Sequence, residues 1–268
     1  MNQTQDFTKG VIWKQLLFFF FPILIGSFFQ QLYNTVDTII VGQTVGTSAL
    51  AAVGSTGNLT NLIINFYVGL STGASVVIAQ YYGAQNNKKI HQAVHTSYSL
   101  AIVSGILMML FGLFFSYQCL DAIGTPHDIL NDATLYMQLY FLCMIPGAIY
   151  NIGAGILRAV GDSKRPLYYL IVCSIVNVVF DFIFVVIFHQ GIAGAAIATV
   201  IAQFVCAILV TIQLMRTNEV YKLTLSKMKF HLPVLKKIIM IGAPAGIQST
   251  MYSISNIVLQ SHINAFGT

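Results

Sequence analysis

Charged residues are scarce in this chain. Only 8% of its 268 residues are Asp, Glu, Lys or Arg, whereas 56% are hydrophobic and the mean hydropathy is +0.77. Soluble domains carry about 25% charged residues, which their surface needs in order to stay dissolved. The composition therefore excludes a soluble protein and predicts one that crosses a membrane several times.

Groups that bind metals or form disulfides are also few. The four cysteines have no close pairing typical of a disulfide framework or a metal site, so we expect them to pack. His91 and His95 have the spacing of two zinc ligands on one helix, but no third ligand stands near them and a solvated helix end is preferred. The sequence lacks a Ser-His-Asp arrangement and a phosphate-binding Gly loop, so we expect no enzyme and no cofactor.

Long apolar runs dominate what is present. A helix needs about 20 mostly apolar residues to cross a bilayer, whereas a barrel strand is about ten residues long and alternates. The chain has long runs at 12–41, 57–82, 92–117, 133–157, 167–189, 193–215 and 237–266. These runs predict an all-α membrane protein, a polytopic bundle of transmembrane helices.

The basic residues are confined to every second connection between the apolar runs and to the N-terminal end. All 13 Lys and Arg residues lie at the start of the first run or after the second, fourth and sixth runs. The connections 42–56, 118–132 and 190–192 have none. Because cytoplasmic loops collect Lys and Arg, we expect a multi-pass protein of the cell membrane, plasma or inner, with a cytoplasmic N-terminus. The same bias explains the net charge of +5 without a nucleic-acid partner.

Two of the eight acidic residues, Asp37 and Asp181, stand in the middle of apolar runs. An ionisable group at membrane depth costs about 2.5–3.5 kcal/mol on insertion scales and indicates a functional site. With no Lys or Arg in the interior of any expected span, each carboxylate must be protonated, bind a cation or face water. These are the states that a cation-coupled transporter uses. The same lack of basic residues argues against an anionic headgroup as ligand.

Polar residues surround both acids at helical spacing. Gln30, Tyr33 and Asn34 share a helix face with Asp37, and Asn177 shares one with Asp181. The second and sixth runs add Asn61, Asn65, Thr199 and Gln203. Hydrogen bonds between helices, worth about 0.6 kcal/mol per pair, explain the amides equally well but not the acids.

Glycines predict two local structures. Gly161 is suited to end a helix with a positive φ, and Asp162 and Ser163 favour the turn that follows. Gly69 and Gly73 form a small-xxx-small face, which predicts close helix packing.

Several motifs together resemble the multidrug and toxic compound extrusion (MATE) family. They are Arg-Ala-Val-Gly-Asp-Ser-Lys-Arg-Pro at 158–166, Tyr-Asn-Thr-Val-Asp at 33–37, Asn-Val-Val-Phe-Asp at 177–181 and Ala-Gly-Ala-Ala-Ile-Ala-Thr at 193–199. The resemblance implies two six-helix lobes, alternating access, and expulsion of cationic or amphipathic small molecules against Na+ or H+ flow. It divides the chain into an N-terminal six-helix lobe at 1–215, a basic cytoplasmic linker at 216–236, and the first helix of a truncated second lobe at 237–268. The missing second lobe is then an expected partner.

A faint internal repeat agrees with this division. A shift of 222 residues aligns Pro22, Ser27 and Asn34 with Pro244, Ser249 and Asn256. Repeated halves commonly line the central site of a transporter. With no second lobe to cover it, we expect the last helix to be poorly held.

The resemblance also implies roles for particular residues. Asp37, Asn177, Asp181 and Thr199 match a cation-coupling site, which would bind Na+ or take up H+. Pro22 matches a proline associated with bending of the first helix. The residues expected at the substrate cavity are Pro22, Gln30, Tyr33, Asn34, Asn61 and Asn65.

Two other functions remain open. One is a lipid or polysaccharide flippase of the same superfamily, which would need a cavity that binds a headgroup. The other is a membrane protein that does not transport, such as a receptor, an assembly subunit or an inactive fragment. A membrane protein that does not transport should keep its activity when both Asp37 and Asp181 are changed.

Overall fold

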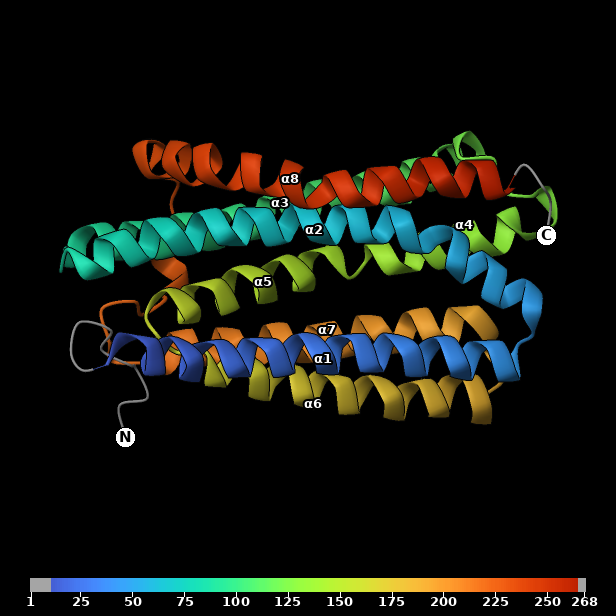
Figure 1. The fold of residues 1–268 in the computed structure, drawn as a ribbon, viewed down its shortest axis with the longest axis horizontal. Coiled ribbons are helices and arrows are strands. Elements are labelled where there is room, and N and C mark those ends of the chain that lie inside the picture. The colour runs from blue at the N-terminus through green and yellow to red at the C-terminus, as the bar shows by residue number, and fades with distance from the viewer. Residues whose placement is uncertain (1–10, 265–268) are drawn as a thin grey trace.

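A computed structural model describes the backbone of residues 11–264 and most of their side chains (Figure 1). The helices are α1 (Ile12–Thr44), α2 (Thr47–Gly83), α3 (Asn87–Ala122), α4 (His127–Phe141), α5 (Met144–Ala159), α6 (Lys164–Asp181), α7 (Gly191–Arg216) and α8 (Leu232–Asn264). A π-helical segment, η1 (Phe182–Ile187), continues α6, and a 3-10 turn, η2 (Leu225–Lys227), lies between α7 and α8. No strand occurs within residues 11–264.

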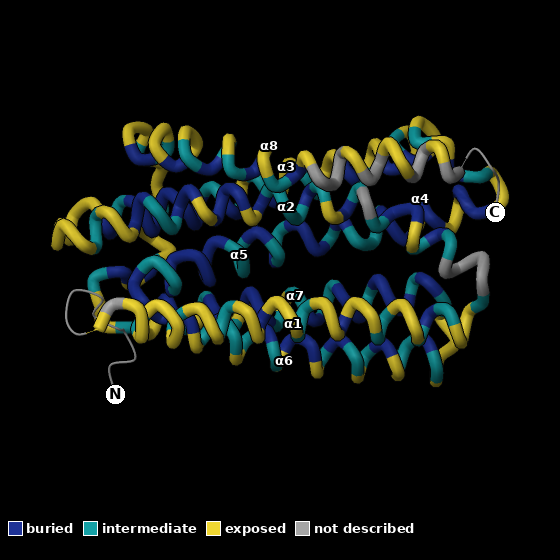
Figure 2. Tube along the Cα trace, in the orientation of Figure 1, coloured by how far each residue is buried: buried dark blue, intermediate teal, exposed yellow. Residues whose placement is uncertain are grey.

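The helices run side by side in an elongated bundle (Figure 1). α1, α6 and α7 pack together on one side, α2, α3 and α8 form the other, and α5 contacts α2, α3 and α7 between them. Figure 2 shows buried residues toward the middle and exposed ones on the outer faces. Many of the exposed residues are large and apolar, including Phe18, Leu107, Phe114 and Ile175. An apolar exterior suits contact with lipid and agrees with the predicted membrane bundle.

The expected spans match the helices with two differences. Five helical spans are long and apolar enough to cross a membrane, at 13–44, 51–83, 87–122, 164–187 and 191–216. The fourth expected span is not one helix: α4 and α5 qualify only as a pair, bent by 46° at the break between them. The last expected run forms α8, but α8 does not qualify as a span by the same test, applied to the described residues.

The basic connections gather at one end of the bundle. In Figure 1 the α2–α3, α5–α6 and α7–α8 connections lie at the same end as the N-terminus, and the α1–α2 and α3–α4 connections lie at the opposite end. This is the alternation that the loop charges indicate. Which end faces the cytoplasm stays a prediction.

The connection between α7 and α8 is tied to the start of α3. His95 is fully buried, and its Nε2 lies 3.0 Å from the backbone N of Thr224. His231 donates its backbone N–H to Thr96 Oγ1 over 3.2 Å. The expected solvated helix end is therefore wrong for His95. His95 is buried because it contacts Thr224, which lies 129 residues later in the sequence.

Glycines bring α2 and α8 together. A Cβ placed on Gly73 would lie 2.6 Å from Gly242 Cα, and one placed on Gly69 would overlap Gly246 Cα. The close packing predicted for Gly69 and Gly73 is confirmed. The helix expected to be poorly held thus lies along α2 at a distance that only glycine allows.

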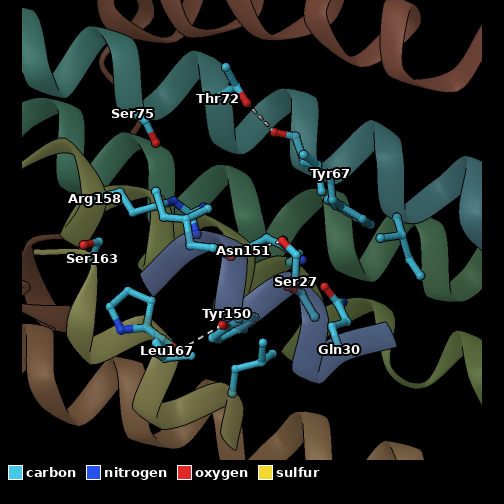
Figure 3. Close-up of a pocket in the computed structure, with 18 of the residues that line it drawn as sticks. Ser27, Gln30, Tyr67, Thr72, Ser75, Tyr150, Asn151, Arg158, Ser163 and Leu167 are labelled. Carbon is cyan, nitrogen blue, oxygen red and sulfur yellow. Dashed lines mark hydrogen bonds between the residues drawn. The ribbon is translucent and has the colours of Figure 1, made fainter. Parts of the chain in front are cut away.

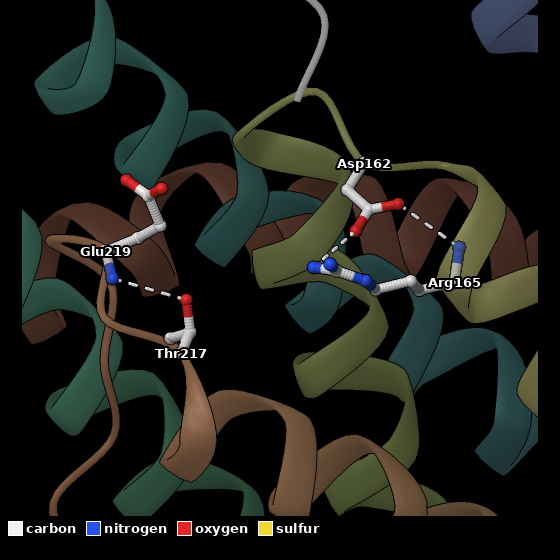
Figure 4. A network of polar contacts seen from close by, with 4 residues as sticks. All are labelled: Asp162, Arg165, Thr217 and Glu219. Atoms are coloured by element: carbon white, nitrogen blue, oxygen red, sulfur yellow. Dashed lines mark hydrogen bonds and ion pairs between the residues drawn. The ribbon is translucent and has the colours of Figure 1, made fainter. Parts of the chain in front are cut away.

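The turn between α5 and α6 has the predicted form (Figure 4). Gly161 has a φ of 87°, in the left-handed region. Buried Asp162 accepts the backbone N–H of Arg165 at Oδ1 over 3.1 Å, and its Oδ2 lies 3.1 Å from Arg165 Nη1 as an ion pair. Asp162 therefore supplies a hydrogen-bond acceptor for a backbone N–H in the first turn of α6, where the helix itself offers none.

Candidate functional site

Asp181 ends α6 at the point where the helix widens into the π-helical η1. Its side chain is fully buried, and among the described residues neither carboxylate oxygen has a hydrogen-bond partner. Burial of an unpartnered carboxylate is costly unless it takes a proton or binds a cation. Single π-turns within helices are also frequent at functional sites. Asp181 is thus the residue around which a site is best sought.

Asn177 lies one helical turn before Asp181 on α6. It donates Nδ2 to Thr199 Oγ1 on α7 over 3.4 Å, and Thr199 in turn donates to the carbonyl oxygen of Ala195 over 3.1 Å. Asn177 Oδ1 has no hydrogen-bond partner in the described part of the chain. The donor groups are used between and within helices, which leaves an amide oxygen available beside the acid.

Asp37 approaches from α1. It is half-buried, its Oδ1 lacks a hydrogen-bond partner in residues 11–264, and it lies within electrostatic reach of Asp181. Tyr136 of α4 lies within reach of both acids. Helices α1, α6 and α7 therefore carry the four residues predicted for cation coupling. Asp37 lies within electrostatic reach of Asp181, and Asn177, one turn before Asp181, is hydrogen-bonded to Thr199.

The oxygen atoms of this four-residue cluster are of the chemical kind that hard cations prefer. The atoms without hydrogen-bond partners in the described structure are Asp37 Oδ1, Asn177 Oδ1 and both Oδ atoms of Asp181. Carboxylate and amide oxygens suit hard cations, and the carboxylates can instead take a proton. The described residues contain no group of three or more His, Cys, Asp or Glu side chains placed to bind a metal. A cation site here would accordingly depend on the neutral oxygens as well as the acids.

A cavity of about 690 Å³ lies between α1, α2, α5 and α6 (Figure 3), and none of the four cluster residues lines it. Its volume is in the range of sites for drug-sized ligands. The wall is mixed: apolar residues such as Phe19 and Ile64 alternate with hydroxyl and amide groups. The polar residues labelled in Figure 3 include Ser27, Gln30, Tyr67, Thr72, Ser75, Tyr150 and Asn151.

The structure divides the residues predicted for the cavity. Pro22, Gln30 and Tyr33 line it. Asn34, Asn61 and Asn65 lie outside its lining, with Asn34 and Asn61 exposed and Asn65 half-buried. Helical spacing places residues on a face but does not say which neighbour that face meets. Pro22 stands within the continuous helix α1 and removes one backbone hydrogen bond there.

Two tyrosines of α4 connect the cluster with the cavity. Tyr140 lines the cavity and stacks on Tyr136, with ring centroids 6.1 Å apart. Tyr136 is the residue within reach of Asp37 and Asp181. This pair was not among the residues predicted from the sequence, although two tyrosines four residues apart must share a helix face.

Arg158 was also missed as a cavity residue. It lies in the last turn of α5, is half-buried and lines the cavity. Arg158 stands just past the expected span 133–157, so the argument against an anionic headgroup, which considered only the interiors of the spans, did not take it into account. The sequence marked Arg158 only as part of a cytoplasmic turn.

Comparison with known proteins decides the family. The MatE family model matches residues 22–183. The chain belongs to the MatE family. The probable multidrug resistance protein YoeA of Bacillus subtilis (strain 168) is 28% identical to this chain over 272 residues. The match covers 99% of this chain and 59% of YoeA. Multidrug export protein MepA of Staphylococcus saprophyticus is 22% identical over 270 residues, with 99% of this chain and 59% of MepA covered.

Solved structures agree with this assignment. A crystal structure of a MATE protein in the bent conformation has a TM-score of 0.84 at 27% identity, covering 90% of this chain and 54% of that one. A MOP superfamily transporter from Pyrococcus furiosus Vc1 (DSM3638) has a TM-score of 0.84 at 28% identity, covering 90% and 53%. The resemblance to MATE transporters and the all-helical membrane fold are confirmed. The MatE chain spans less than two thirds of the length of these relatives, at 59% of both YoeA and MepA.

Proposed function

We propose that this MatE protein is part of an antiporter that exports amphipathic or cationic compounds across the cell membrane in exchange for Na+ or H+. The observation that carries the proposal is the buried, unpartnered Asp181, in a bundle that also contains a cavity large enough for a drug-sized molecule. Relatives named as multidrug resistance or export proteins support the export of drugs. The protein then needs no enzyme chemistry and no cofactor.

The proposed activity belongs to a two-lobe transporter. Residues 1–215 would form its first lobe, 216–236 the linker, and 237–268 the first helix of the second lobe. The matched relatives are long enough for a second lobe, since this chain covers 59% of YoeA and of MepA. Alternating access would then arise from movement of one lobe against the other.

Coupling would act through charge at the four-residue cluster. Protonation of Asp37 and Asp181, or Na+ bound between them, neutralises the acids and changes how α1 packs near Pro22. The stacked Tyr136 and Tyr140 offer a direct route for that change from the acids to the cavity wall. A neutralised cluster would hold a cationic ligand less firmly, so ion and substrate would compete.

The flippase alternative gains one observation from the structure. Arg158 supplies the cavity with a positive charge, which a lipid headgroup would need. The alternative of a membrane protein that does not transport has no comparable observation in its favour.

Ion binding to the chain in lipid nanodiscs tests the proposal. Calorimetric titration with Na+ in two buffers of different ionisation enthalpy measures both binding and the protons released. We expect wild-type protein to bind Na+ with proton release, or to bind only protons, and Asp181→Asn to lose that binding. Asp121→Asn, which changes an exposed acid, is the control. Equal Na+ and proton binding by wild type and Asp181→Asn would contradict the proposal.

A further inference from the structure

Arg158 is the charged residue of the main cavity. Among the described residues that line this cavity, no other is Asp, Glu, Lys or Arg. Figure 3 shows Arg158 on the wall together with Ser75, Asn151 and Ser163. These neighbours offer hydroxyl and amide groups but no negative charge. The cavity therefore has one charged position, at the end formed by the α5–α6 turn.

The arginine has no ion-pair partner within residues 11–264. Asp162 is the nearest acid along the chain, and it pairs with Arg165 instead. The group within electrostatic reach of Arg158 is the phenol of Tyr150, which already donates its hydroxyl to the carbonyl oxygen of Pro166 over 3.2 Å. A half-buried guanidinium with five N–H donors thus lacks a countercharge. An anion in the cavity would supply it.

Acidic residues lie outside the cavity lining. Asp37 and Asp181 do not line the cavity, although Tyr140 of the lining lies within electrostatic reach of Asp37. The wall also includes apolar side chains such as Phe19, Ile64 and Val68. A ligand that matches this surface has an apolar body and an acidic group at one end.

We propose that Arg158 binds the anionic group of an amphipathic ligand, as carboxylate, sulfonate or phosphate, while the apolar body of the ligand packs against α1 and α2. The planar guanidinium favours such groups because it can donate two parallel hydrogen bonds to them. The inference rests on the proposed function in taking this cavity as the substrate site. It adds acidic amphiphiles, which include both acidic drugs and anionic lipids, to the compounds that the cavity binds.

Three probes with the same apolar body test the inference. They are 2-naphthalenesulfonate, 2-naphthalenemethanol and a naphthylmethyl trimethylammonium salt, titrated calorimetrically into the chain in phosphatidylcholine nanodiscs. We expect the sulfonate to bind at least tenfold more tightly than the neutral probe. Arg158→Gln should abolish that difference while changing the affinity for the neutral probe less than twofold. Arg158→Lys should keep part of the preference, because it retains the charge but loses the paired donors.

Arg216→Gln is the matched control. Arg216 also stands in the last turn of a helix, α7, but is exposed and lies outside the cavity lining. It should leave all three affinities unchanged. If Arg158→Gln does not fold, salt gives a second measurement on wild-type protein, since only the affinity for the sulfonate should fall as ionic strength rises. An unchanged sulfonate preference in folded Arg158→Gln, or no salt dependence in wild type, would overturn the inference.

The lipid composition of the nanodisc decides whether the anionic ligand of Arg158 is a lipid headgroup or a soluble compound. In nanodiscs that contain phosphatidylglycerol, competition with the sulfonate in wild-type protein would assign the site to an anionic headgroup. Undiminished sulfonate binding would assign it to acidic compounds that enter from solution. Failure of ion binding at Asp181 would remove the proposed coupling but would not alter these affinities, so the two proposals fail separately.

Discussion

Asn177 and Thr199 are joined by a hydrogen bond of 3.4 Å from Nδ2 to Oγ1, which connects α6 with α7 one turn before Asp181. Thr199 passes its own hydrogen to Ala195, so both donors point into the protein framework. The acceptors Asn177 Oδ1 and Asp181 Oδ1 and Oδ2 are left without partners in the described structure. The cluster is thus rich in oxygen acceptors, the arrangement that a cation needs.

Removal of the neutral oxygens should separate Na+ binding from proton binding. Asn177→Ala and Thr199→Val should each weaken Na+ affinity roughly tenfold, because neutral oxygens complete a Na+ shell. Proton uptake should persist, since the carboxylates remain. Calorimetric titration measures both, with Ser174→Ala as control because Ser174 bonds only to Leu170 of its own helix. Equal loss of proton uptake would show that these residues do more than complete a cation shell.

The glycine contact between α2 and α8 predicts a difference between two substitutions in one helix. Gly73→Ala should destabilise the protein by about 1–3 kcal/mol, because its Cβ would lie 2.6 Å from Gly242 Cα. Gly54→Ala has nothing within 4 Å and should be neutral or stabilising by up to about 1 kcal/mol. Thermal unfolding in detergent, with protease cleavage within α8, gives the comparison. Similar stability of the two variants would mean that α8 is not held on α2 in this way.

Asp162 predicts a pH dependence of stability. Burial raises the pKa of this carboxyl, and the Arg165 amide and guanidinium oppose the shift only in part. A raised pKa in the folded state means that the folded protein keeps a proton that the unfolded chain has lost. Stability should therefore fall as pH rises from about 4, the ordinary carboxyl pKa, through the raised value, and then level off.

Asp162→Asn should remove that slope, because it keeps an oxygen to accept the Arg165 N–H but cannot ionise. Asp162→Ala should lose about 1 kcal/mol at every pH, because it removes the acceptor for the Arg165 N–H in the first turn of α6. Thermal unfolding measured between pH 4 and 7 separates the three proteins. The same slope in wild type and Asp162→Asn would assign the pH dependence to another group.

Membrane orientation follows from the grouping of basic connections at one end of the bundle. Single cysteines at Asp128 and Asn87, both exposed, should differ in their reaction with an impermeant thiol reagent added outside intact cells. We expect Asp128→Cys to react and Asn87→Cys not to react. The background needs Cys119→Ser, because Cys119 is the native cysteine that is not fully buried. Labelling at Asn87→Cys alone would reverse the orientation.

The helices were largely predictable because apolar length is a local property of sequence. The bend between α4 and α5 was not, since the two residues at the break, Leu142 and Cys143, are not helix breakers. Pro146 was the available signal, because proline is tolerated in the first turn of a helix. The π-helical turn after Asp181 also has no local signature, as it depends on how η1 packs against α1 and α7.

The acidic residues of the candidate site were predictable because a charged side chain is unfavourable inside an apolar span. Asp37 and Asp181 stood out because an acid in an apolar run needs an explanation. Tyr136 and Tyr140 did not, since aromatic residues in an apolar run look like ordinary core. Arg158 was hidden for a third reason: only the fold shows that the last turn of α5 meets a cavity rather than water.

Substrate efflux tests the central claim, that Asp37 and Asp181 couple ion entry to export. Vesicles that contain the complete gene product are loaded with a fluorescent amphiphile, and efflux is measured under an imposed Na+ or pH gradient. Asp37→Asn, Asp181→Asn and the double variant keep shape and polarity but fix the side chains neutral. We expect each single variant to abolish gradient-dependent efflux and the double variant to add little, because residues that act as one unit are not additive. Full gradient-dependent efflux by the double variant would contradict the account.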